Sequence, residues 1–269
     1  MFDTEAYLRA IGFSGPVYIE PKTLRKLHRV HMMAIPYNTA NTARTPDQGA
    51  VDQNPVAPAD ADPDLDAIFD TAILQRRGGV CFELNALFRR LLRELGFQVE
   101  YLSAGVHDSD GAFGPDLQHL ILGVRLTGTL WLVDVGFAGP GFLEPLRVGD
   151  GVQSQYGCDY RVMREDSYVV VERRAKGGDW KALYRLRDQA RTLEDWSRSG
   201  VGQPAGAGNG GGPAGDSAVT RSRAVENGQL VLVGRRLLTV EDGHERVSVL
   251  AKTADFDQAV DLIMGQSDG

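Results

Sequence analysis

The most regular pattern of hydrophobic positions in the chain runs from residue 84 to residue 95. Apolar side chains recur there at the spacing of one helix face, namely Leu84, Leu87, Phe88, Leu91, Leu92 and Leu95. Arginines fill intervening positions and Gly96 follows, so the pattern predicts an amphipathic helix that packs on a core and ends at the glycine. Shorter helices are predicted over residues 5–11 and 21–35; Pro21 favours the start of the second, and the Ile35-Pro36 step its end.

The hydrophobic period changes after Gly96 to short apolar runs that are typical of strands. These runs are rich in Val, Leu and aromatic residues and are separated by Gly, Asp and Pro. They cover residues 97–106, 118–126, 130–137 and 168–174, and later 229–233, 236–240 and 246–250. A helical pattern over 255–264 follows the last of them. Helices first and strands afterwards indicate an α+β fold.

Two segments lack a pattern that could build a core. Residues 41–66 hold four prolines and six aspartates against one arginine, and we expect a mobile surface insertion there. Residues 199–217 contain eight glycines without the sequence context of a phosphate-binding loop, which predicts a linker or disordered loop.

The composition narrows the possible partners. The chain has 269 residues and a formal charge of −7, so its overall field repels polyanions and argues against binding to nucleic acid or an anionic membrane. The sequence has no apolar run of the roughly 18 to 20 residues that a spanning helix needs, and its acidic N-terminus is unlike a signal peptide. We therefore expect a cytoplasmic protein.

Cys81 is the first candidate for chemistry. It stands at the predicted start of the 84–95 helix, directly after Gly78 and Gly79, which let the backbone turn sharply. The free N–H groups and the partial positive charge of a helix N-terminus favour a thiolate and can hold a developing oxyanion. The other cysteine, Cys158, has no such setting, and two cysteines without a C-x-x-C spacing predict neither a disulfide framework nor a zinc site.

A histidine and a carboxylate that could serve this thiol come from one predicted hairpin. His119 opens a strand that turns at Thr127-Gly128, a two-residue hairpin loop. If Leu126 pairs with Thr129, then Asp134 faces residue 121, and side-chain alternation makes His119 and Asp134 diagonal neighbours at roughly 7 to 8 Å between backbones. Asp134 lies in an otherwise apolar strand, where a charge needs a partner.

Other readings of the polar residues carry less weight. A metal site drawn from the loop residues His107, Asp108, Asp110 and Asp116 together with His119 lacks an established ligand spacing, and solvated turn residues explain the loop better. We therefore expect no metal. His28 and His31, three residues apart on a helix, and His244, in a turn, are expected to be structural or solvated.

These motifs resemble the arylamine N-acetyltransferase family. The block from Arg77 to Asn85 matches its active-site signature, His119 with Leu120 matches its histidine strand, and the run 132–137 matches its aspartate strand. The resemblance covers roughly residues 3–196. It implies a helical bundle over 1–96, a β-barrel over 97–190, and an interdomain segment, glycine-rich loop and α/β lid over 191–269.

The resemblance also implies roles for individual residues. Cys81 would be the nucleophile, His119 the base and Asp134 the carboxylate that orients it. Phe137 would line the acceptor pocket, and the further substrate-binding candidates are Gly136, Tyr37 and Phe82. The implied reaction is ping-pong: the cysteine takes an acyl group from a thioester and passes it to an amine, usually aromatic. No permanently bound cofactor is needed.

Three departures from the family pattern surround this triad. Asn38, Thr39 and Ala40 replace an expected Glu-Asn-Leu, the insertion 41–66 follows, and a glycine tract stands where the family has an aromatic and His-Pro segment. We infer a rebuilt acyl-donor site. The related ansamycin-type amide synthases release a polyketide from the phosphopantetheine thioester of an acyl carrier protein by closing a macrolactam onto its own aryl amine, and this is the favoured specific reading.

Several alternatives stay open. An arylamine N-acetyltransferase that uses acetyl-coenzyme A is the main one. The negative charge of the chain also counts mildly against the amide synthase, because carrier proteins are acidic too. Arginines could offset that charge if they cluster on the surface, namely Arg25, Arg29, Arg89, Arg90 and Arg93. A transglutaminase-like or peptidase-like cysteine hydrolase would lose its acyl group to water without an amine. A binding or scaffold protein would show no greater reactivity at Cys81 than at Cys158.

Overall fold

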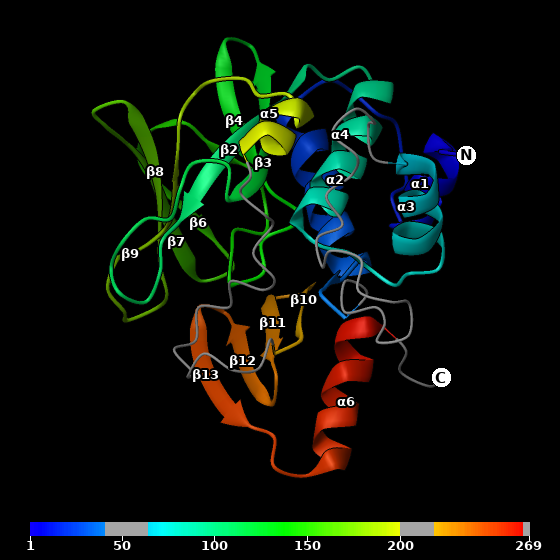
Figure 1. Cartoon of the computed structure of the whole chain (residues 1–269), viewed down its shortest axis with the longest axis vertical. Coiled ribbons are helices and arrows are strands. Elements are labelled where there is room, and N and C mark those ends of the chain that lie inside the picture. Colours follow the sequence, from blue (N-terminus) through cyan, green and yellow to red (C-terminus); the bar gives the residue numbers. More distant parts are fainter. Residues whose placement is uncertain (41–63, 200–217, 266–269) are drawn as a thin grey trace.

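The computed structural model describes residues 1–40, 64–199 and 218–265. Figure 1 shows three regions: a group of helices that holds the N-terminus, an eight-stranded sheet beside it, and a smaller sheet with one helix below both. The chain therefore has the α+β fold that the sequence predicts, and both sheets are antiparallel throughout.

The N-terminal region is built from helical segments that pack around α4. They are α1 (Thr4–Ala10), α2 (Pro21–Ala34), α3 (Leu65–Ile68), the π-helical turn η1 (Phe69–Leu74) and α4 (Cys81–Glu94). Asp3 caps α1 by accepting the Ala6 N–H at 2.8 Å, and Pro21 is the first residue of α2. The apolar stripe of α4 is buried from Leu84 to Leu92, as its period requires, and Leu95 just beyond the helix is half-buried. The three helices predicted for this region are confirmed.

The larger sheet curls into a nearly closed barrel. Its strands are β2 (Val99–Val106), β3 (His119–Leu126), β4 (Thr129–Val133), β5 (Leu146–Arg147), β6 (Gly149–Gln155), β7 (Cys158–Glu165), β8 (Tyr168–Arg174) and β9 (Lys181–Leu186). They follow the order β5-β4-β3-β2-β9-β8-β7-β6. At the seam between the two edge strands, the Gln153 amide accepts from Arg147 N–H at 2.8 Å and donates to Arg147 C=O at 2.9 Å. These bonds pair the backbone N–H and C=O of an edge strand, which would otherwise have no partner in the sheet.

The smaller sheet draws a strand from the N-terminal region. It contains β1 (Tyr37–Asn38), β10 (Thr220–Val225), β11 (Gly228–Val233), β12 (Arg236–Glu241) and β13 (His244–Val249), in that order. Helix α6 (Thr253–Met264) covers one face, where Ile263 packs against Leu230 and Leu232. Because β1 pairs with β10, the segment that follows α2 is joined directly to this five-stranded sheet, called the lid sheet below. Helix α5 (Leu193–Ser199) lies between the two sheets in sequence.

Several sequence-based boundaries were wrong or incomplete. The run 130–137 is a strand only as far as Val133. The prediction missed β1, β5, β6, β7, β9 and β10. Strands β1 and β5 have only two residues each, whereas β7 does alternate apolar Cys158, Tyr160 and Val162 with polar residues, so a strand signal was overlooked there. Within 41–66, residues 65 and 66 begin α3, and 41–63 lie outside the described residues. Within 199–217, Ser199 ends α5 and the rest lies outside them too. Among the described helices, none is long and apolar enough to cross a membrane.

Candidate active site

The start of α4 places Cys81 at the edge of the helical region. Gly78 has φ +69°, and a Cβ there would lie 2.0 Å from the carbonyl oxygen of Pro36, so this position requires glycine. The Glu83 carboxylate accepts the Val80 N–H at 2.9 Å and fixes the turn into the helix. Cys81 is the first residue of α4 and remains partly exposed. Its sulfur therefore lies within the positive end of the helix dipole.

The hairpin of β3 and β4 brings His119 to Asp134. The predicted register is confirmed, since Leu126 pairs with Thr129 across a turn in which Thr127 and Gly128 both have positive φ. Asp134 Oδ2 lies 2.7 Å from His119 Nε2, and both side chains are buried. Helix α4 packs against β3, so the same imidazole also hydrogen-bonds the Cys81 side chain. Because Asp134 holds Nε2, the nitrogen left for the thiol is Nδ1.

The electrostatics of this group favour an ion pair. Burial lowers the pKa of His119, but the charge and hydrogen bond of Asp134, followed by the hydrogen bond to Cys81, outweigh it and raise the pKa to about 10. Burial raises the pKa of Asp134, and the His119 charge together with hydrogen bonds from Asn85 and Gly136 more than reverses this, so the carboxyl group stays ionised. The imidazole is thus held protonated beside the sulfur at neutral pH.

Asn85 is a part of this network that the sequence did not single out. Its amide nitrogen donates to Asp134 Oδ1 at 3.1 Å and to the Leu120 carbonyl at 2.9 Å. Its amide oxygen accepts the Val135 N–H at 3.0 Å. The sequence did contain a sign of this role, because Asn85 follows Cys81 by four residues and therefore lies on the same face of α4. The helix that carries the thiol therefore also anchors the carboxylate.

His28 supports Asp134 from α2, although the sequence favoured only a structural role for it. Burial lowers the pKa of His28, which is therefore neutral. Its Nδ1 lies 2.9 Å from the Leu143 carbonyl oxygen, and its Nε2 lies 3.2 Å from the backbone nitrogen and 3.1 Å from the carbonyl oxygen of Asp134. The backbone of Asp134 is thereby fixed from the helical region. The neighbouring His31 is also buried and contacts the Tyr7 hydroxyl at 3.2 Å.

Aromatic residues enclose the imidazole. The rings of Phe137 and His119 meet edge to face with centroids 5.5 Å apart, and the Tyr184 ring lies 5.7 Å from each. Tyr184 had no signal in the sequence, because it lies on the unpredicted strand β9. These rings exclude water from the side of the imidazole that they cover.

Of the remaining substrate-binding candidates, Gly136 and Tyr37 lie beside Cys81 or the turn before it, whereas Phe82 packs on the core. A Cβ on Gly136 would lie 2.6 Å from Cys81 Cα, and Tyr37 is bridged to Gly79 at the turn before the thiol. Burial first, and then the charge of Cys81, raises the pKa of Tyr37, so a neutral phenol lies near the sulfur. Phe82 differs, because its half-buried ring packs against the helical core.

The residues of the alternative metal site serve other purposes. The His107 ring packs on Phe113, and the Asp108 carboxylate accepts N–H groups within its own turn. Asp116 pairs with Arg187. Across the described residues, no group of three or more His, Cys, Asp or Glu side chains is arranged to hold a metal ion.

The second cysteine, Cys158, is buried in the barrel. Burial raises the pKa of its thiol, although Arg173 donates to its sulfur at 3.2 Å.

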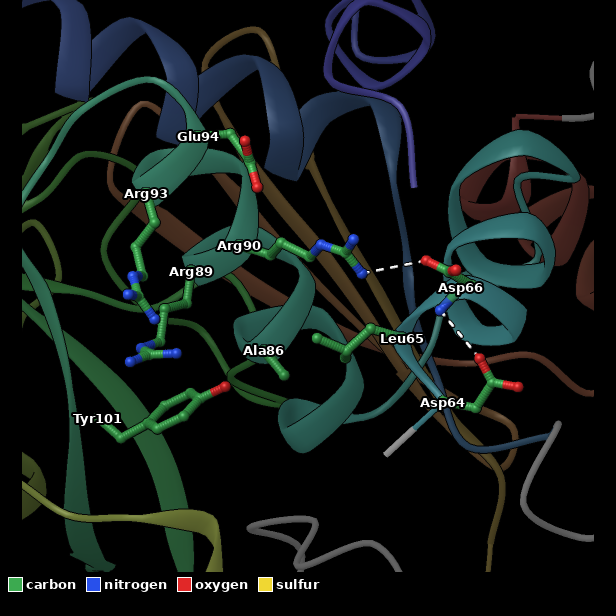
Figure 2. A pocket seen from close by; sticks show the side chains of 9 residues that line it. All are labelled: Asp64, Leu65, Asp66, Ala86, Arg89, Arg90, Arg93, Glu94 and Tyr101. Atoms are coloured by element: carbon green, nitrogen blue, oxygen red, sulfur yellow. Dashed lines mark hydrogen bonds and ion pairs between the residues drawn. The ribbon is translucent and has the colours of Figure 1, made fainter. Parts of the chain in front are cut away.

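The five arginines considered for a charged surface do not gather in one place. Arg89, Arg90 and Arg93 line a pocket of about 620 Å³ beside α4, and the guanidinium groups of Arg89 and Arg93 lie side by side near Tyr101 (Figure 2). The pocket also holds Asp64, Asp66 and Glu94, of which Asp66 pairs with Arg90 at 3.0 Å. Arg25 and Arg29 lie elsewhere, stacked on Trp131 and Tyr156. The equal number of acids and arginines in this pocket gives it no net positive charge.

Comparison with known proteins places this geometry in context. A family model described as N-acetyltransferase matches residues 21–265. Proansamycin X synthase of Amycolatopsis mediterranei is 35% identical over 276 aligned positions that cover 100% of this chain and 99% of that protein. Arylamine N-acetyltransferase of Escherichia coli is 33% identical, over 67% of this chain and 59% of that protein.

Solved structures show the same fold. The arylamine N-acetyltransferase of Mycobacterium smegmatis has a TM-score of 0.76 at 25% identity, covering 97% of this chain and 91% of that one. The Mycobacterium marinum arylamine N-acetyltransferase in complex with CoA has a TM-score of 0.78 at 23% identity, covering 99% and 95%. The barrel, the helices and the lid sheet are therefore shared with these structures.

Proposed function

Because the chain belongs to the arylamine N-acetyltransferase family and is an acyltransferase, we propose that it is an amide synthase of the ansamycin type. In this role it joins a polyketide acyl group, carried as a thioester on an acyl carrier protein, to an aromatic amine of the same molecule and closes a macrolactam. The observation that supports this choice is the similarity to proansamycin X synthase along the whole chain. The E. coli acetyltransferase matches over only two thirds of it.

The proposed first half-reaction acylates Cys81. The thiolate attacks the thioester carbonyl, and the new C–S bond forms while the negative charge moves to the carbonyl oxygen near the N-terminus of α4. The bond to the donor thiol then breaks. The leaving thiolate takes the proton of His119, whose Nδ1 faces the sulfur. Asp134 stabilises the imidazolium before this transfer and keeps the ring in one orientation.

The proposed second half-reaction consumes the acyl-cysteine. The amine nitrogen attacks the carbonyl, His119 accepts a proton from that nitrogen, and the C–S bond breaks to return the Cys81 thiolate beside a protonated imidazole. An aryl amine suits this step because it is neutral and nucleophilic at pH 7, whereas an alkyl amine with a pKa of about 10 is mostly protonated. The Phe137 ring, packed on His119, offers an apolar surface for the aromatic acceptor.

The second candidate function is acetyl transfer from acetyl-coenzyme A to an arylamine. It is favoured by the similarity to the E. coli arylamine N-acetyltransferase over two thirds of the chain and by the fold shared with an enzyme solved in complex with CoA. A hydrolase would use the same three side chains, with water in place of the amine. The three possibilities differ in the donor that loads Cys81 and in what removes the acyl group.

Intact-mass analysis tests the proposal. The protein is incubated with acetyl-coenzyme A and, separately, with a long-chain acyl N-acetylcysteamine thioester; then aniline is added. We expect a long-chain adduct on the wild type, its discharge on addition of aniline, and no adduct on Cys81→Ala. An adduct from acetyl-coenzyme A alone would favour the second candidate. Discharge at the same rate without aniline would indicate a hydrolase, and an adduct on Cys81→Ala would overturn the assignment of the nucleophile.

A further inference from the structure

A buried glutamine in the lid sheet reaches the loop that follows Asp134. Gln229 lies on β11 and is 3% exposed. Its amide oxygen accepts the Gly141 N–H at 3.1 Å, and its amide nitrogen donates to the Gly139 carbonyl at 3.3 Å. A buried primary amide is costly unless both of its polar ends are hydrogen-bonded, and here the two ends bind backbone groups of one short loop.

The loop held by Gln229 packs directly on Phe137. A Cβ on Gly139 would lie 3.1 Å from Phe137 Cε1, and one on Gly141 would lie 3.3 Å from its Cδ1. The opposite face of the loop is held by the barrel, where the Tyr160 hydroxyl donates to the Gly141 carbonyl at 2.8 Å. The Phe137 ring is therefore confined between this loop and the His119 imidazole.

Apolar contacts also join the lid sheet to this loop. Val240, which pairs with Gln229 across β11 and β12, is buried in the same cluster as Phe137 and Phe142. Apolar contacts hold two surfaces together but do not fix their register, whereas a glutamine that bonds one N–H and one C=O does. Gln229 thus adds a directional contact between the lid sheet and this loop, beside the Arg173–Glu245 ion pair that joins the same sheet to the barrel.

We propose that Gln229 is a positioning residue for the acyl acceptor. By holding residues 139–141, it keeps the Phe137 ring against His119 and sets the width of the space in which an aromatic amine approaches the acyl-cysteine. The expected effect on the KM for the amine rests on the proposed function. The two hydrogen bonds that hold residues 139–141 do not depend on that function. Gln229 touches neither Cys81 nor His119 in its hydrogen bonding, so the triad itself is complete without it.

The test compares Gln229→Leu with a matched control, Gln153→Leu. Gln153 makes the same pair of bonds to backbone N–H and C=O, but at the barrel seam. Three quantities are measured for each variant: hydrogen exchange of the peptide that contains Gly141, the rate at which iodoacetamide alkylates Cys81, and the KM for aniline in acyl transfer. Gln229→Glu should keep one of the two hydrogen bonds and lose the other, because a carboxylate can accept from the Gly141 N–H but cannot donate to the Gly139 carbonyl.

For Gln229→Leu we expect exchange at Gly141 to become at least about tenfold faster. We also expect the KM for aniline to rise on the order of tenfold, because displaced contacts near a reacting centre are costly. The Cys81 alkylation rate should stay within about twofold of the wild type. Gln153→Leu should leave all three unchanged, and Gln229→Glu should lie between the wild type and Gln229→Leu.

Two results would overturn the proposal. Unchanged exchange at Gly141 would show that Gln229 does not hold the loop, and this readout needs no substrate. Faster exchange at Gly141 with an unchanged KM for aniline would show that the hydrogen bonds of Gln229 do not affect the acceptor. Faster exchange with slower alkylation of Cys81 would show that they affect the nucleophile as well. Failure of the proposed function is seen separately, as a wild-type protein that no acyl thioester loads.

Discussion

His119 Nε2 and Asp134 Oδ2 lie 2.7 Å apart although Asp134 is the first residue beyond the strand that pairs with β3. The hairpin register thus brings the two residues near each other, while the contact itself depends on groups outside the hairpin. Asn85 binds the carboxylate, and His28 binds its backbone N–H. Asp134 is therefore fixed from α4 and α2, the two helices that pack beside the barrel.

Replacement of the carboxylate by an amide should remove activity through the tautomer of the histidine. In Asp134→Asn, the new side chain can still accept from Asn85 and Gly136 through its oxygen, which turns its NH2 group toward His119. The imidazole must then accept at Nε2 and carry its proton on Nδ1, so it cannot take the proton of the thiol. By analogy with other triads we expect a loss of about 10⁴-fold in acyl transfer. Steady-state kinetics measure it, and a loss below tenfold would contradict the orienting role.

The raised pKa of His119 predicts a dependence of stability on pH. The unfolded imidazole loses its proton near its ordinary pKa of about 6.5, whereas the folded one keeps it up to about 10. Between these values the folded state binds more protons, so the free energy of unfolding falls as pH rises. The difference in this free energy between the wild type and His119→Gln should be largest at pH 6 and should shrink by pH 10. Urea titrations at the two pH values measure it; a difference that grows with pH would contradict the buried ion pair.

The residues of the triad could be predicted from the sequence because each depends on local pattern. Cys81 follows two glycines at the start of an amphipathic helix, and the pairing of His119 with Asp134 follows from a two-residue turn. Gln229 could not be predicted, because its partners at residues 139 and 141 lie about 90 positions away and a glutamine among apolar residues carries no signal of direction. The sequence placed His28 on a predicted helix but gave no sign of its contact with Asp134, which comes from a different part of the fold.

Removal of the imidazole at residue 28 should destabilise the protein and misplace Asp134. In His28→Phe, a ring of similar size can still stack on Phe142, but the Asp134 N–H and the Leu143 carbonyl lose a buried partner. Each unsatisfied group costs about 1 to 3 kcal/mol, so with two such groups we expect the free energy of unfolding to fall by roughly 2 to 6 kcal/mol. Urea denaturation measures it, with exposed His244→Phe as the control. Because the pKa of folded His28 lies below that of the unfolded imidazole, its support is weaker at pH 6 than at pH 8, so the loss should be larger at pH 8. A variant as stable as the wild type would exclude this support.

A single methyl group at residue 136 should separate the thiol from the imidazole. The Cβ of Gly136→Ala would lie 2.6 Å from Cys81 Cα and 3.0 Å from the Cys81 carbonyl oxygen, and both are backbone atoms of α4 that cannot rotate away. The helix start or the Asp134–Phe137 segment must therefore move, at a cost of about 1 to 3 kcal/mol. Either movement separates Cys81 from the hairpin that carries His119, so we expect slower alkylation of Cys81 and a large loss of acyl transfer. Gly178→Ala is the control, because its Cβ would meet nothing closer than 3.5 Å. A Gly136→Ala protein with normal alkylation and normal melting temperature would show that α4 and this segment are not packed as closely as the structure describes.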